Sequence, residues 1–79
     1  MEKKDMFDVV VGELIAKARK EKGISQRDLA KAIRIPRGSI SNWEIGRAPM
    51  PLSKARLICD YLGLDIDEVA NIAWERSKQ

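Results

Sequence analysis

Apolar residues recur along this chain at helical spacing. Val11, Leu14, Ile15 and Ala18 lie at i, i+3, i+4 and i+7, which gives one apolar stripe of an amphipathic helix. Four further segments carry similar stripes, and the only β-branched run, residues 9–11, lies inside the first of the five. The pattern therefore predicts an all-α fold of five short helices joined by tight turns.

Capping and helix-breaking residues set the expected helix limits. Ser25 and Asp65 are predicted N-caps, each followed three residues later by an acidic side chain, and Asp5 or Asp8 is the candidate cap of the first helix. Three glycines are expected to end the first, third and fourth helices: Gly23, Gly46 and Gly63. The expected helices cover about 6–21, 26–33, 36–45, 51–62 and 66–76.

Composition limits the chemistry that is open to the chain. Its 79 residues predict a single domain over 1–79, and the absence of histidine argues against His-based catalysis or metal binding. Cys59 is the only cysteine, so we expect a buried apolar residue and neither a disulfide nor a multi-cysteine zinc site. No phosphate-binding glycine loop or nucleophile motif is present. We therefore predict no enzyme, no catalytic residue, no metal and no cofactor.

No segment predicts a membrane span or a signal peptide, and a single cysteine suits a reducing compartment, so we expect a cytoplasmic protein without a membrane partner. The formal charge is +3, but it is unevenly distributed. Residues 17–56 hold 11 basic and 3 acidic side chains, whereas the remaining residues hold 4 basic and 9 acidic ones. The basic segment favours a polyanionic partner, and the acidic ends favour a protein partner.

Residues 26–45 carry the most informative pattern. Two segments of about eight residues meet across a turn at Arg34-Ile35-Pro36, and their apolar positions are Leu29, Ala30, Ile33, Ile35, Ile40 and Trp43. The opposite face of the second segment presents Arg37, Gly38, Ser41 and Asn42. Arginine can bond guanine bidentately and asparagine can pair with adenine, so this face is suited to the DNA major groove. The alternative is an ordinary solvated helix face.

The spacing resembles the lambda-repressor-like helix-turn-helix domain of phage Cro, phage repressors and Xre-type regulators. The resemblance covers about residues 10–73 and rests on four stretches: Gly12-Glu13-Leu14-Ile15 through Arg19, Gly23-Ile24-Ser25-Gln26 with Leu29-Ala30, Ile40-Ser41-Asn42-Trp43-Glu44 with Gly46, and Leu62-Gly63-Leu64. It implies a compact five-helix domain with the helix-turn-helix at its second and third helices. It also implies a sequence-specific transcriptional regulator, such as a repressor, that binds double-stranded DNA.

The resemblance implies roles for particular residues. Base contacts fall on Arg37, Gly38, Ser41 and Asn42, and phosphate contacts on Gln26, Lys31, Arg34, Ser39 and Arg47. Arg19 and Glu44 match an ion pair between the first and third helices. Two positions depart from the family pattern. Arg34 stands where a tight turn usually has Gly or Asn, which predicts a positive φ at an arginine. Pro36 stands at the usual cap of the third helix and has no side-chain oxygen to offer.

Such domains act as homodimers on palindromic operators, so a dimer surface is expected on the fifth helix and its neighbours. The candidates are Leu64, Ile66, Val69 and Trp74. Trp74 could instead pack on the first helix. A different class of function is a protein-interaction module, such as an antitoxin or a coactivator-like adaptor, that uses the fifth helix together with Met6 and Phe7.

Overall fold

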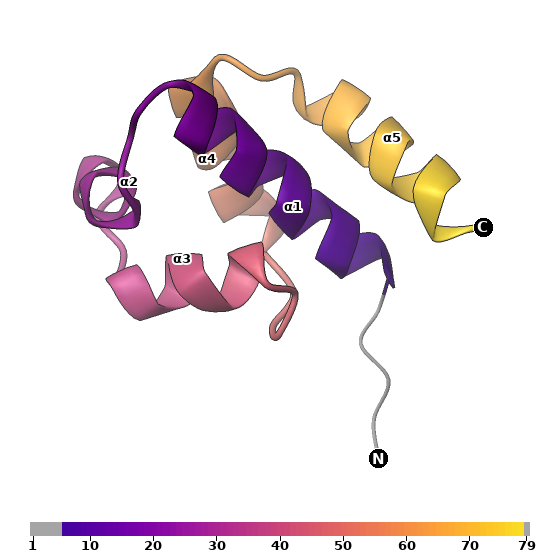
Figure 1. Cartoon of the computed structure of the whole chain (residues 1–79), viewed down its shortest axis with the longest axis horizontal. Coiled ribbons are helices and arrows are strands. Elements are labelled where there is room, and N and C mark those ends of the chain that lie inside the picture. The colour runs from indigo at the N-terminus through magenta and orange to yellow at the C-terminus, as the bar shows by residue number, and fades with distance from the viewer. Residues whose placement is uncertain (1–5, 79) are drawn as a thin grey trace.

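Each of the five apolar stripes folds into a helix in the computed structural model, which describes residues 6–78 (Figure 1). The helices are α1 (Met6–Glu21), α2 (Gln26–Ile33), α3 (Arg37–Glu44), α4 (Leu52–Leu62) and α5 (Ile66–Ser77). No strand occurs within residues 6–78. The all-α, five-helix prediction is therefore confirmed, and the predicted helix limits agree closely with the observed ones.

The helix ends follow the local signals in the sequence. The Ser25 Oγ accepts a hydrogen bond from the Asp28 backbone N–H at 2.9 Å, and the Asp65 Oδ1 accepts one from the Asp67 N–H at 2.8 Å. The three expected stop glycines adopt positive φ angles of 69°, 74° and 72°. Of the two candidate caps of α1, Asp8 is wrong, because it lies inside the first turn, where a carboxylate faces the positive end of the helix dipole. Asp5 lies outside the described residues.

All five helices contribute side chains to one core. Ile15 of α1, Leu29 of α2, Ile40 of α3 and Ile58 of α4 are almost completely buried, and Val69 of α5 joins the same cluster. Figure 1 shows α1 running through the middle of the molecule, with α5 along one side of it and α3 along another. The core therefore fixes α3 against α1, and this contact decides how α3 is presented to a partner.

Cys59 is buried in this core, as its position in the apolar stripe predicts. Burial raises the pKa of its thiol above the ordinary value, and the nearby carboxylates of Asp60 and Asp65 raise it further. The thiol is therefore kept in its neutral, poorly nucleophilic form, which suits a packing residue.

Candidate nucleic-acid interface

The turn between α2 and α3 is closed by backbone hydrogen bonds around Arg34. This residue has φ 59° and ψ 52°, the only positive φ at a non-glycine residue within 6–78. The next residue, Ile35, donates its backbone N–H to the Ala30 carbonyl at 3.0 Å. This bond closes the end of α2. A glycine at position 34 would adopt the same positive φ without strain. The predicted positive φ at Arg34 is confirmed.

The start of α3 is held by its backbone alone. Pro36 occupies the N-cap with φ −63° and ψ 141°, and no side chain accepts a hydrogen bond from the first turn. The Ser39 N–H donates to the Pro36 carbonyl at 3.0 Å. The first turn of α3 therefore lacks a side-chain cap, as expected from the missing side-chain oxygen of Pro36. The preset φ of proline partly compensates, because it removes conformational freedom at the point where the chain enters the helix.

A buried carboxylate ties three elements together behind this turn. Arg19 of α1 donates from Nε to Glu44 Oε2 at 2.6 Å and from a terminal nitrogen to Glu44 Oε1 at 3.0 Å. Gln26, the first residue of α2, donates from Nε2 to the same Oε1 at 2.9 Å. A further Arg19 nitrogen reaches the Ile24 carbonyl at 2.7 Å. The structure thus joins the two residues expected to pair, and it connects α1, α2 and the end of α3 through one carboxylate.

Both members of this ion pair are buried, each with only 7% of its surface exposed. The hydrogen bond to Glu44 raises the pKa of Arg19 above its already high ordinary value, so the arginine stays charged. Gln26 has two N–H groups on Nε2, and one of them is used for Glu44. Gln26 thus joins the start of α2 to the end of α3.

Two glycines allow α1 to lie directly against the end of α3. A Cβ built at Gly12 would stand 2.2 Å from the Trp43 carbonyl oxygen, and one built at Gly46 would stand 2.6 Å from Val9 Cγ2. Neither contact is sterically possible, so both positions require glycine for this packing. Sequence reasoning did not assign Gly12 this role, although an isolated glycine within a helical pattern is a known signal of close packing.

The polar face of α3 remains open. Arg37 and Gly38 are exposed and Ser41 and Asn42 are half-buried, whereas Ile40 is buried in the core and Glu44 in its ion pair with Arg19. Positions 37, 38, 41 and 42 therefore lie on one side of the helix, as their spacing predicts. No side chain fills the space in front of Gly38, where an added Cβ would meet nothing within 4 Å.

The residues expected to contact phosphate lie on α2, at its end, on α3 and just after α3. Lys31, Arg34 and Arg47 are exposed, and Ser39 is half-buried. A hollow beside the helix-turn-helix is lined by Arg19, Ser25, Gln26, Arg27, Asp28 and Arg37. Sequence reasoning missed Arg27, an exposed basic residue next to Gln26 at the start of α2. Its signal in the sequence was a basic side chain in the first turn of the first helix of the helix-turn-helix.

The four residues proposed for a dimer surface are in different environments. Trp74 is 58% exposed, and Lys78 Nζ lies 5.6 Å from the centre of its ring. Leu64 and Ile66 are partly buried against the core. Val69 is only 7% exposed and belongs to the core, so its side chain is not available on the surface. The helical stripe of α5 was read correctly as apolar, but Val69 lies on the side that faces the other helices.

Comparisons with known proteins agree with this geometry. A family model described as helix-turn-helix matches residues 15–69, and the chain belongs to this family. Among solved structures, the chain is similar to the clp gene regulator ClgR from Corynebacterium glutamicum, with a TM-score of 0.83 and 25% sequence identity. The match covers 96% of this chain and 81% of that one. No curated protein sequence gives a significant match.

The expected family and fold are therefore confirmed, with α2 and α3 as the helix-turn-helix. Family membership and likeness to a gene regulator classify the chain as a DNA-binding transcriptional regulator and point away from an enzyme. Within residues 6–78, no helix has both the length and the apolar character that crossing a membrane requires.

Proposed function

We propose that this protein regulates transcription by binding a palindromic operator as a homodimer, with α3 of each copy in the major groove. The observation that carries the proposal is the open face of α3. It presents Arg37 and Asn42, five residues apart, while Ile40 is buried in the core and Glu44 holds the end of the helix to Arg19. An α-helix fits the major groove, which is about 12 Å wide.

The surroundings of α3 support the same orientation. Basic side chains at 27, 31, 34 and 47 are exposed on the helix-turn-helix and its flanks, where they would meet phosphates. Phosphate contacts position the protein, whereas base contacts provide specificity. Gln26 would connect a phosphate contact to the recognition helix. One N–H of its amide is bonded to Glu44 of α3, and its second N–H would bond a phosphate oxygen.

Selection of bound duplexes from a random pool tests the proposal. We expect an enriched palindrome whose half-sites are separated by about one helical turn, near 34 Å. Enrichment of an asymmetric site would contradict the palindromic homodimer. Binding without any enriched sequence would contradict specific readout by α3.

Replacing Arg37 tests direct base readout. Arg37→Ala should relax base preference at one position of each half-site and cost about 1–3 kcal/mol on the preferred base. Arg47→Ala is the matched comparison, because a phosphate contact contributes almost equally on all sequences. Both variants should be titrated against the operator and its single-base variants. Uniform weakening by Arg37→Ala would assign Arg37 to phosphate and contradict the proposed readout.

A further inference from the structure

Gly38 differs from the other four glycines of the chain in what the fold requires of it. Three of those four have positive φ angles, and a Cβ at the fourth, Gly12, would stand 2.2 Å from the Trp43 carbonyl oxygen. Gly38 has the ordinary backbone of an α-helix, and a Cβ added to it would meet no other part of the protein within 4 Å. Neither backbone conformation nor packing within residues 6–78 therefore requires a glycine at position 38.

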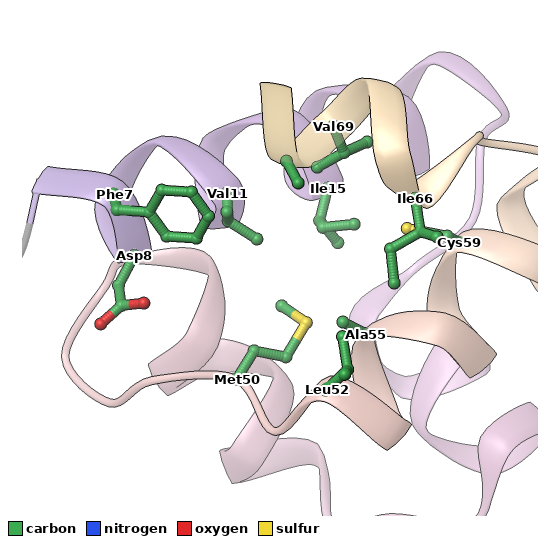
Figure 2. A pocket seen from close by; sticks show the side chains of 11 residues that line it. Phe7, Asp8, Val11, Ile15, Met50, Leu52, Ala55, Cys59, Ile66 and Val69 are labelled. Atoms are coloured by element: carbon green, nitrogen blue, oxygen red, sulfur yellow. The ribbon is translucent and has the colours of Figure 1, made fainter. Parts of the chain in front are cut away.

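A glycine at this position weakens the helix that carries it. Glycine in a helix is less stable than alanine, because its backbone loses more conformational freedom on folding. Gly38 is the second residue of α3, a helix of eight residues whose N-cap, Pro36, makes no side-chain hydrogen bond. Figure 2 shows the apolar pocket between α1, α4 and α5, and the described residues that line it include none of α3. The glycine therefore serves neither the stability of α3 nor this pocket.

The missing side chain lies within the polar face of α3. Arg37 precedes Gly38, and Ser41 and Asn42 lie three and four residues further on, one turn along the same side of the helix. These three neighbours carry side chains that can bond to base edges. Gly38 is exposed and leaves a notch among them. At this notch the backbone of α3 can come closer to a partner than it could beside any side chain.

The chemistry of the notch favours a base group that needs no hydrogen bond. In the major groove the bases present donors and acceptors, and the 5-methyl group of thymine is the one apolar group. A polar group enclosed against Gly38 would lose its hydrogen bonds to water without replacement, whereas enclosing a methyl group is favourable. We infer that Gly38 is a specificity-determining residue whose missing side chain admits a thymine methyl group. This inference rests on the proposed function, because it requires α3 in the major groove.

Replacing one thymine of the selected operator by uracil removes only the methyl group. Arg37→Ala and Asn42→Ala locate the base pairs that those side chains read, and we expect a thymine at a pair adjoining one of them. Uracil at that thymine should weaken binding by the wild type about fourfold, the effect of one buried methyl group. Uracil at a thymine outside the half-sites is the matched control and should leave the affinity unchanged. Titration of the full chain with labelled duplexes measures both.

Gly38→Ala tests whether the methyl group meets Gly38 itself. The variant should fold, because its Cβ has room, and its melting temperature should rise by about 2–4 °C. Its affinity for the thymine operator should fall about fivefold or more, because the Cβ and the methyl group compete for the same space. For the same reason, the loss caused by uracil should disappear in this variant. A protein that is more stable but binds less tightly separates a partner contact from a role in folding.

Equal binding of the thymine and uracil operators by the wild type would overturn the inference. The same uracil loss in Gly38→Ala as in the wild type would also overturn it, because the methyl group would then lie elsewhere. So would a Gly38→Ala protein that is less stable than the wild type or binds the operator equally well. Selection that enriches a palindrome without a thymine beside the pairs read by Arg37 and Asn42 would contradict this inference alone. Selection that enriches no sequence would contradict the proposed function, and this inference with it.

Discussion

Glu44 shows how a single side chain can hold a recognition helix in place. Both of its carboxylate oxygens are buried and bonded, one to Arg19 and the other to Arg19 and Gln26. Taking a charged pair out of water is costly, so such a pair contributes modestly to net stability when intact. Its value lies in geometry, because it sets the end of α3 relative to α1 and α2.

Removing one partner of this pair should therefore cost more than removing both. Glu44→Ala leaves the guanidinium of Arg19 buried without its counter-charge and should destabilise the fold by about 3–5 kcal/mol. Arg19→Met combined with Glu44→Leu should destabilise it less than Glu44→Ala, because no buried charge remains. Urea unfolding of the wild type, Glu44→Ala, the single variants Arg19→Met and Glu44→Leu, and the double variant measures this. If the double variant lost as much free energy of unfolding as the two single variants together, the two side chains would not be coupled.

At the scale of helices, the sequence predicted most of the fold because the signals are local. Ser25, Asp65 and the stop glycines act within one turn of the chain, so their positions gave the helix limits directly. The polar face of α3 followed from helical spacing in the same way. Features that depend on how helices pack could not be predicted from the apolar stripe of a single helix. Examples are the contact of Gly12 with α3 and the burial of Val69.

The turn between α2 and α3 offers a test at this scale, because stability and DNA affinity should change in opposite directions. Arg34→Gly should stabilise the fold by about 0.5–1 kcal/mol, since a positive φ costs a side-chain-bearing residue about 1–2 kcal/mol and glycine loses part of this gain in the unfolded chain. It should also weaken DNA binding, because the basic group is lost.

Arg34→Ala is the matched control for this turn. It removes the same charge but keeps the strained φ, so it should weaken DNA binding to the same extent without the gain in stability. Thermal unfolding and DNA titration of both variants give the comparison. Equal stability of the glycine and alanine variants would show that the observed φ of Arg34 stores no strain.

At the scale of the whole molecule, the charge is arranged in space as well as along the chain. The exposed basic residues 27, 31, 34, 37 and 47 lie on α2, α3 and the segment after them, whereas the first turn of α5 carries Asp67 and Glu68. The net charge of +3 therefore understates the attraction of one face for DNA. The arrangement of the charges also distinguishes the basic helices from α5, where acidic groups would repel phosphate.

This polarity predicts that basic residues of the two regions contribute differently to the salt dependence of binding. Arg47→Ala should lower the slope of log affinity against log salt by about one unit per copy, because one phosphate contact and its released counterion are lost. Arg76→Ala removes the same charge from the last turn of α5 and should leave the slope unchanged. Fluorescence anisotropy at a series of salt concentrations measures both. Equal reductions by the two variants would mean that net charge, rather than the arrangement of charge around α3, determines binding.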